Sequence, residues 1–553
     1  MSTPSVNPSE QPGAGNTGRL QRWVISVALV AILVTMFWLV TEQSNLRNRL
    51  AREQTAVRIG SGNIATLKKR LSEAEARSGQ IESNLNAVQS RLAKEKVRVT
   101  RLKKVAAEYA KQLPMQYPDC NVVLVSFDAL QAAHVGHLGY FRDVTPTIDE
   151  VAEQGFAFSN TYSVASWTIP STMTWFTGVY PSEHRMVNKF AKYQPPTKQL
   201  ARLDKMASNL VTLAELFKEN GYATAGFTGN AGVSGGFGYE KGFDVYYYPK
   251  GTFGGFDGSV PRALDWLKAH KNEKLFLFLH GYDVHGQSVP PGGFDYRFVD
   301  KDYDKRYSGD PREQELLREE GLDKGKLSMR KEDVRFWRAV YDEKIQRADA
   351  RFREFLKTYD KLGLMDKSLF VLTSDHGTEF YEHHRFDHGF TLYDELIHVP
   401  LIVRLPKQMA GRLVSDRVSS VDVMPTIIDL ANLEVPESVR QQLRGQSLVP
   451  VMQGQPAKRD IFAETDYREY TYKRCIVTPD GWKLIYTLED NSKELYHLPT
   501  DPGETKNLVH EEKQRAENLK QTLFAHYRSI GRDLTAERWI KGFNPVYDSQ
   551  MKK

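Results

Sequence analysis

Acidic and imidazole side chains follow two apolar runs in this 553-residue chain. Asp128 comes directly after Asn121-Val-Val-Leu-Val-Ser-Phe127, and Asp375 and His376 come shortly after the run at 369–372. Continuous apolar runs predict strands buried on both faces, and functional residues gather at the carboxyl ends of such strands. Carboxylates and imidazoles at those ends could bind a divalent cation or transfer protons. A lone aspartate at a strand end is otherwise a turn or cap residue.

A hydroxyl-rich segment, residues 166–181, reads Ser-Trp-Thr-Ile-Pro-Ser-Thr-Met-Thr-Trp-Phe-Thr-Gly-Val-Tyr-Pro. It resembles the nucleophile segment of the sulfatase family, which is Cys/Ser-x-Pro-Ser-Arg followed by Thr-Gly-x-Tyr-Pro. Two positions differ from that pattern. Thr168 stands where a sulfatase has the Cys or Ser that is oxidised to formylglycine, and Thr172 stands where it has Arg. The resemblance implies that Thr168 is the catalytic nucleophile.

The string Thr373-Ser-Asp-His-Gly377 resembles the second metal motif of the alkaline phosphatase superfamily, of which sulfatases are a branch. The resemblance implies that Asp128, Asp375 and His376 bind one divalent metal ion and that the Thr168 oxygen completes the site. Sulfatases generally have a second acid after the first, where this chain has alanine, and Asn where His376 stands. Losing a carboxylate and gaining an imidazole favours Zn or Mn over Ca.

The resemblance extends to two histidine-containing segments, 278–286 and 382–389. His285 aligns with the histidine that contacts the leaving-group oxygen in sulfatases, where a general acid contributes about 10² to 10⁴ in rate. Asp283 could orient it or could be a loop cap. His388 fits a Gly-His-Gly element that faces the site and is expected, with His383, to line the substrate pocket. A second metal on His388, His383 and Asp387 is a less favoured alternative.

Two asparagines, Asn188 and Asn230, are candidate oxyanion donors for substrate binding, and the alternative for each is an ordinary loop residue. The resemblance covers about residues 119–510 and rests on separate motifs in family order. It predicts the fold and the family, but it does not determine which kind of ester is the substrate.

Three functions fit these residues. Threonine cannot become formylglycine because its β-carbon carries a methyl group. The first hypothesis is therefore a phosphodiesterase or phosphotransferase that acts on phosphate esters through Thr168. The second is a sulfatase that works without formylglycine, and the third is a non-catalytic sulfatase-like head on a coiled-coil scaffold. The loss of Arg at position 172 and of the second acid at 129 favours the third, whereas the retained Thr168 and metal motifs oppose it.

The surrounding elements predict an α/β fold with a mainly parallel sheet covered by helices on both faces. Apolar runs at 121–127, 275–279 and 369–372 alternate with helical patterns, including 211–221 and 332–362. We expect a catalytic domain at 119–440. A small C-terminal α+β subdomain at 441–553 should end in a helix over 511–530.

The N-terminal part predicts a membrane anchor. Residues 1–22 have the composition of a disordered cytoplasmic tail, and residues 23–40 form an apolar run that is just long enough to span a bilayer. A cleaved signal peptide is the alternative, but no small-residue cleavage site follows the run. Charges on either side do not fix the orientation. By analogy with other N-terminal anchors, we place the large domain outside the cytoplasm.

A coiled-coil stalk is predicted at 45–113. Apolar residues occupy heptad positions a and d from Ile64 to Leu113, interrupted only by Ser78 and Glu95. This pattern favours a homo-oligomer, dimeric or trimeric, and the alternative is one amphipathic helix that lies on the domain.

Composition narrows the cell compartment and the partners. A net charge of +6 without a basic arm argues against nucleic acid as the ligand, and two cysteines cannot form a disulfide framework. No Asn-x-Ser/Thr glycosylation site occurs, which favours a bacterial envelope protein over a eukaryotic secreted one. We therefore expect a single-pass inner-membrane protein with a periplasmic catalytic domain, whose phosphate- or sulfate-ester substrate is a lipid or an envelope glycan.

Overall fold

A computed structural model describes residues 40–52, 69–79 and 113–536, apart from 188–205, 230–231 and 251–252, together with residue 539 and a few positions between 81 and 108. The chain divides into two compact units, Met1–Ala106 and Ala107–Lys553. In the first unit, residues 40–52 and 69–79 are helical. The predicted span at 23–40 and most of the predicted heptads lie outside the described residues. Among the helices that are described, none combines the length and apolarity needed to cross a membrane.

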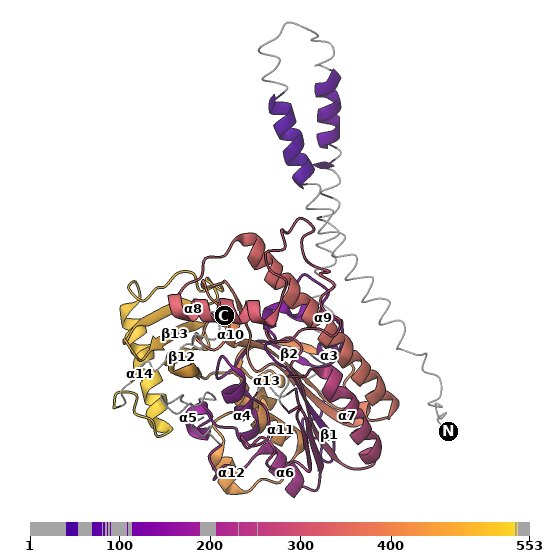
Figure 1. Cartoon of the computed structure of the whole chain (residues 1–553), viewed down its shortest axis with the longest axis vertical. Coiled ribbons are helices and arrows are strands. Elements are labelled where there is room, and N and C mark those ends of the chain that lie inside the picture. The colour runs from indigo at the N-terminus through magenta and orange to yellow at the C-terminus, as the bar shows by residue number, and fades with distance from the viewer. Residues whose placement is uncertain are drawn as a thin grey trace, which may run out of the picture. The chain divides into compact units, whose positions relative to one another are not determined.

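The second unit is built on an eight-stranded sheet with the order β10-β2-β9-β6-β1-β5-β3-β4. Figure 1 labels β1 and β2 of this sheet. Its strands are β1 Asn121–Phe127, β2 Phe156–Tyr162, β3 Ala223–Phe227, β4 Val245–Tyr247, β5 Leu275–Gly281, β6 Ser368–Thr373, β9 His398–Arg404 and β10 Arg412–Ser419. Only β9 pairs antiparallel with its neighbours, so the predicted mainly parallel sheet is confirmed. The three predicted strands agree with β1, β5 and β6 to within two residues.

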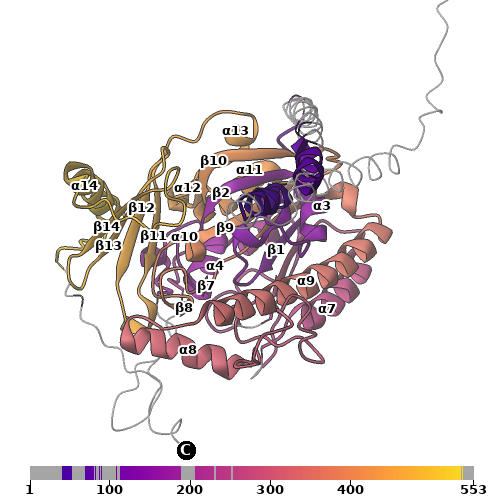
Figure 2. The same cartoon turned by 90° about the horizontal axis from the view of Figure 1, so that it is seen from above.

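Helices cover both faces of this sheet because alternate residues of its strands are apolar on both sides. Val122 and Leu124 of β1 pack against the layer that contains α4 Thr168–Thr177, α6 Leu213–Glu219 and α11 Val423–Ala431. Val123 and Val125 pack against the opposite layer, which contains α3 Pro146–Gln154, α7 Phe256–His270 and α9 Lys331–Lys361. Figure 2 shows α7 and α9 side by side on their face of the sheet. The predicted helices at 211–221 and 332–362 correspond to α6 and α9.

An antiparallel sheet of four strands and a final helix form the C-terminal region. These are β11 Ile461–Thr465, β12 Lys473–Val477, β13 Trp482–Thr487, β14 Lys493–His497 and α14 Lys513–Ser529. The remaining elements are α5 Pro181–His184, α8 Pro311–Lys324, β7 Glu379–Phe380, β8 Phe386–Asp387, α10 Asp394–Ile397, α12 Glu437–Gln442, α13 Val449–Met452 and the 3-10 turns η1 Ala132–His134, η2 Gly136–Leu138, η3 Met365–Lys367, η4 Ser420–Asp422 and η5 Tyr467–Glu469.

Strand register brings the chemical motifs together. Phe127 of β1 pairs with Gly281 of β5, and Ser126 of β1 pairs with Thr373 of β6. The residues that follow these three strands therefore leave the sheet at the same edge, which is where functional groups gather in parallel sheets.

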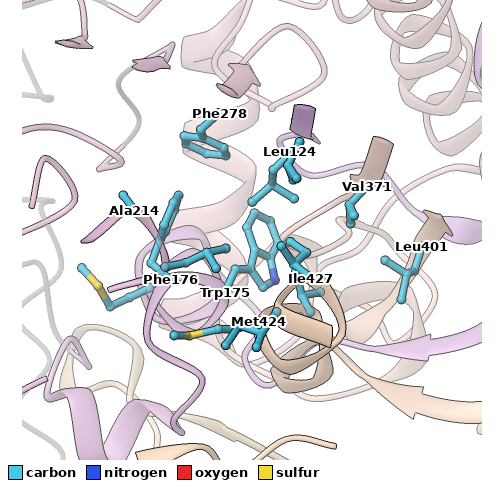
Figure 3. Close-up of a cluster of buried hydrophobic side chains, with 14 of the residues drawn as sticks. Leu124, Trp175, Phe176, Ala214, Phe278, Val371, Leu401, Met424 and Ile427 are labelled. Atoms are coloured by element: carbon cyan, nitrogen blue, oxygen red, sulfur yellow. The ribbon is translucent and has the colours of Figure 1, made fainter. Parts of the chain in front are cut away.

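Helix α4 is fixed beneath this edge by its own buried residues. All ten of its side chains are buried, and Trp175 and Phe176 lie among Leu124, Phe278 and residues of α11 (Figure 3). Gly178 ends the helix with φ 67°, a conformation that glycine adopts without strain. The packing of α4 thus sets the position of Thr168 at its first turn.

We expect Trp175→Ala to destabilise the second unit by about 3–5 kcal/mol, because the indole leaves a large cavity in a close-packed core. The measurement is the midpoint of urea unfolding, monitored by far-ultraviolet circular dichroism, because that backbone signal does not depend on the tryptophan that is removed. Phe141→Ala is the control, since that ring is 80% exposed. Equal midpoints for the two variants would contradict the packing described for α4.

Candidate active site

Thr168 lies at the first turn of α4, where unpaired backbone N–H groups and the helix dipole favour negative charge. Its hydroxyl Oγ1 is 3.2 Å from Nε2 of His376, and the side chain is only 4% exposed. A threonine in this position can meet an anionic ester at the positive end of a helix.

Three predicted metal ligands form a group at this edge of the sheet, and one of them, His376, contacts that hydroxyl. Asp128 follows β1, Asp375 and His376 follow β6, and ligand atoms of all three lie within 4.8 Å of one another. Nε2 of His376 is 3.6 Å from Oδ1 of Asp128 and 3.5 Å from Oδ2 of Asp375. The structure therefore brings together the four predicted ligands, Thr168 included.

The hydrogen bonds of His376 show that this group suits a cation. Nδ1 of His376 donates to the carbonyl oxygen of Gly377 at 2.6 Å, so Nε2 carries a lone pair. Burial lowers the pKa of His376, which keeps the ring neutral. Oδ2 of Asp375 is buried and receives no hydrogen bond from any described residue, whereas its Oδ1 accepts from Ala129 N and His376 N. Lone pairs that converge in this way repel one another unless a divalent cation lies between them.

Two more imidazoles stand beside His376. Ring centroids of His376 and His388 are 4.3 Å apart, and those of His285 and His388 are 4.8 Å apart. Ligand atoms of the three rings lie within 4.8 Å of one another, and all three are buried. The structure thus places the predicted residues His285 and His388 next to His376, the residue that contacts the Thr168 hydroxyl.

His285 is held by its own loop, not by Asp283. Its Nδ1 accepts from the N–H of Gln287 at 3.3 Å, and its ring stacks on Tyr282 with centroids 4.2 Å apart. Burial, helped by the neighbouring His388, holds the pKa of His285 well below its usual range. Asp283 instead accepts from Phe256 N at 2.8 Å at the start of α7, so of the two predicted roles it has that of a cap.

His388 is bonded to a buried aspartate. Nδ1–H of His388 donates to Asp387, whose other oxygen lies 3.4 Å from Nη1 of Arg318 on α8. Burial alone would raise the pKa of Asp387, but His388 and Arg318 outweigh it and hold that pKa well below its usual range. Asp387 is thereby occupied with His388 and Arg318, which argues against the alternative in which it is a metal ligand.

His383 does not join this group. Its Nδ1 is 2.6 Å from Glu395, its Nε2 is 3.2 Å from the carbonyl oxygen of Glu504, and its ring stacks on Tyr393. These contacts link the 382–389 segment to the C-terminal region, so the prediction that His383 lines the pocket is not supported by its geometry. Asn188 and Asn230 lie outside the described residues.

Two residues near the site, His280 and Lys344, were not among those predicted from the sequence. His280 of β5 is buried 3.3 Å from Oδ2 of Asp128, and burial lowers its pKa to about 4. Lys344 of α9 donates to the carbonyl oxygens of His285 and Gly286, and burial lowers its pKa to about 7. Only His280 was detectable, as a histidine at the end of an apolar run.

The position usually occupied by arginine has a different partner here. Oγ1 of Thr172 lies 2.7 Å from the hydroxyl of Tyr239, and Tyr239 also donates to the carbonyl oxygen of Ile169 at 2.8 Å. Burial raises the pKa of Tyr239, so this pair is uncharged. The described contacts of Thr168 and Thr172 include no lysine or arginine side chain.

Comparison with protein families gives two matches. The family model described as Sulfatase matches residues 120–433, and the model described as N-sulphoglucosamine sulphohydrolase, C-terminal, matches residues 381–529. The first match contains Asp128, Thr168 and the 373–377 motif, and the second contains the antiparallel C-terminal sheet.

Curated relatives are similar over most of the chain. The Delta 4,5-hexuronate-2-O-sulfatase of Bacteroides thetaiotaomicron is 25% identical over 423 residues, which are 71% of this chain and 85% of the relative. The arylsulfatase of Clostridium perfringens is 22% identical over 486 residues, which are 76% of this chain and 98% of the relative.

Solved structures share the fold. A 2-O GAG sulfatase superposes with a TM-score of 0.60 at 21% identity and covers 77% of this chain and 98% of its own. The phosphonate monoester hydrolase of Agrobacterium radiobacter superposes with a TM-score of 0.57 at 20% identity and covers 74% of this chain and 95% of its own.

We expect the chelator-treated protein to bind one Mn²⁺ or Zn²⁺ ion, and Asp375→Asn to weaken that binding more than about 10²-fold, because even outer partners of metal ligands are worth 10- to 100-fold. Isothermal titration calorimetry measures both values. Asp302→Asn, at an exposed acid, is the control. Unchanged affinity in Asp375→Asn would rule out this ligand set.

The His383–Glu395 pair should make stability depend on pH. Burial lowers the pKa of His383, but Glu395 outweighs it and raises that pKa to about 9. A pKa raised on folding stabilises fully below the unfolded value of about 6.5, and the stabilisation is lost as pH rises through the folded value.

His383→Gln should therefore lower the free energy of unfolding by about 1–2 kcal/mol near pH 6.5 and by much less near pH 10. Urea midpoints of both proteins across this range measure the difference. A gap that stays constant with pH would show that the pair contributes no linked proton.

Proposed function

Because the chain belongs to the sulfatase family, we propose that it is a metal-dependent hydrolase or transferase that attacks a phosphodiester through Thr168. The observation that carries this proposal is the position of the Thr168 hydroxyl, 3.2 Å from His376 at the first turn of α4 and beside two buried carboxylates. The hydrolase class follows from the family, whereas the threonine nucleophile and the phosphate ester are the proposed part.

Threonine needs help to act as a nucleophile, since its hydroxyl is weakly acidic at neutral pH. A divalent ion bound by Asp128, Asp375 and His376 would favour the ionised Thr168 oxygen and neutralise charge on the ester. The first turn of α4 adds backbone N–H groups to that environment.

The proposed reaction has two steps. In the first, Oγ1 of Thr168, having lost its proton to solvent, forms a bond to phosphorus and the bond to the leaving alcohol breaks. His285 is placed to donate a hydrogen bond to the oxygen of the leaving alcohol, because its Nδ1 accepts from Gln287 and its ring proton is therefore on Nε2. The leaving oxygen takes its proton from solvent, so the neutral imidazole keeps its own. In the second step, water or an acceptor alcohol releases the phosphoryl group from Thr168.

Charge favours a monoanionic ester. Two carboxylates balance a divalent ion, the imidazoles of His285 and His376 are neutral, and the described contacts of Thr168 and Thr172 add no lysine or arginine. A phosphodiester carries one negative charge, whereas a phosphate monoester carries up to two and would meet less compensation.

A sulfate ester, also a monoanion, is the second candidate, and the names of the relatives favour it, since they are sulfatases. Against it stands Thr168: a threonine cannot form an aldehyde, so a sulfated Thr168 has no hemiacetal route for release. The fold of the phosphonate monoester hydrolase shows that the scaffold is compatible with phosphorus chemistry in another protein.

We further propose that the 23–40 segment anchors the protein in the inner membrane and that the 45–113 segment forms an oligomeric stalk, so that the catalytic unit acts on envelope lipids or glycans in the periplasm. The apolar run and the heptads support this placement. Light scattering of the detergent-solubilised protein tests the oligomer, and a single protomer per particle would contradict it.

The decisive assay compares a phosphodiester, a phosphomonoester and a sulfate ester of one chromogenic alcohol, using the full-length protein with added Mn²⁺ or Zn²⁺. We expect the phosphodiester to be turned over fastest and Thr168→Ala to lower kcat/KM by about 10³-fold or more, since the nucleophile is lost.

Thr177→Ala, at the other end of α4, is the matched control and should keep full activity. Turnover of the sulfate ester alone would favour the second candidate. Silence with every ester and metal would mean that the head is not catalytic.

A further inference from the structure

The two imidazoles beside His376 present opposite hydrogen-bonding groups to the site. His285 accepts at Nδ1 from Gln287, so its Nε2 carries the ring proton and can only donate. His388 donates from Nδ1 to Asp387, because a carboxylate can only accept, so its Nε2 carries a lone pair. One ring is therefore a donor and the other an acceptor.

This polarity argues against a metal ion held by all three rings. The atoms of His285, His376 and His388 lie close enough to be considered for such a site. A metal needs a lone pair on each nitrogen, and Nε2 of His285 carries a proton while its Nδ1 is occupied by Gln287. The donor–acceptor pair accounts for the geometry better.

Buried ion pairs hold His388 in its acceptor form. Asp387 is completely buried and lies 3.4 Å from Nη1 of Arg318, and Nη2 of Arg318 lies 3.2 Å from Glu319. Glu319 also accepts from Arg468 of η5. The chain of contacts from Arg468 to His388 crosses from the C-terminal region to the site and consists of buried groups throughout.

This series of contacts fixes the orientation and the tautomer of the His388 imidazole. Arg318 fixes the anionic Asp387, and Asp387 fixes both the ring plane and the tautomer of His388, as carboxylate partners of histidine do elsewhere. The stacking of His388 on His376 then directs the ring toward the residue that contacts Thr168.

We propose that Nε2 of His388 accepts the hydrogen bond of the hydroxyl that releases the phosphoryl group from Thr168, and that Arg318 is the positioning residue for this step. The inference rests on the proposed function and assigns its second step. In that step the bond between phosphorus and Oγ1 of Thr168 breaks and a bond to the oxygen of water or alcohol forms. The proton of that hydroxyl ends on Oγ1, so atoms and charge balance.

Rapid-quench kinetics with a phenyl phosphodiester separates the two steps, since the burst of phenol reports attack by Thr168 and the steady state reports release. We expect His388→Asn and Asp387→Asn to slow release by about 10²-fold, so that phosphothreonine accumulates, while the burst rate changes less than about threefold. His285→Gln should instead slow the burst.

Arg318 is tested by rescue. Arg318→Met should slow release by about 10-fold, and Arg318→Lys should recover part of the loss because it keeps a positive charge near Asp387. Lys483→Met is the matched control: Lys483 is equally buried and pairs with Asp394 and Glu504 at 2.7 and 2.8 Å, outside the site. It should lower stability and leave both steps unchanged.

The outcomes separate the two proposals. If mass spectrometry finds no phosphoryl group on Thr168 in any variant, the proposed function fails. If the adduct forms but His388→Asn and Asp387→Asn release it at the wild-type rate, the role of His388 is wrong while the proposed function stands. Equal effects of Lys483→Met and Arg318→Met on release would reduce Arg318 to a structural residue.

Discussion

The site of this protein depends on the convergence of electron-rich atoms at one buried edge of the sheet. Two carboxylates and the lone pair of His376 converge in a buried group, and His376 lies 3.2 Å from the Thr168 hydroxyl. Holding such groups together without compensation costs several kcal/mol per charge. Folding tolerates this cost because rigid strands and a packed helix fix each group, so a divalent cation finds its ligands already in place.

The scaffold positions each group by a different means. Register between β1, β5 and β6 places Asp128, Asp375 and the 282–285 loop at the same edge. Packing places Thr168, since α4 is buried along its whole length beneath that edge. These two devices are independent of the ester, which is why a fold shared with sulfatases and a phosphonate monoester hydrolase can serve different chemistry.

The chain differs from the sulfatase pattern in ways that act together. Thr168 replaces a residue that can be oxidised, and Thr172 with Tyr239 replaces an arginine by a neutral hydrogen-bonded pair. An imidazole also stands where the family has an amide. The site therefore loses the positive charge of the arginine, which favours a monoanionic ester over a dianionic one. The proposed preference for a phosphodiester over the equally monoanionic sulfate ester rests on Thr168 alone, because a threonine cannot form an aldehyde.

The sequence by itself predicted the fold class and the strands at 121–127, 275–279 and 369–372, and its resemblance to the sulfatase family predicted the group of Asp128, Thr168, Asp375 and His376. The strands could be predicted because apolar runs are a local signal of buried strands, and the group of ligands because the motifs that contain it are local strings that resemble those of the family. Tertiary structure alone decided that Asp283 caps α7, that His383 pairs with Glu395, and that Arg318 on α8 fixes Asp387 and through it His388. The partners of a buried side chain come from elements that are distant in the sequence, so the spacing of residues along the chain does not predict which neighbour each charged group contacts.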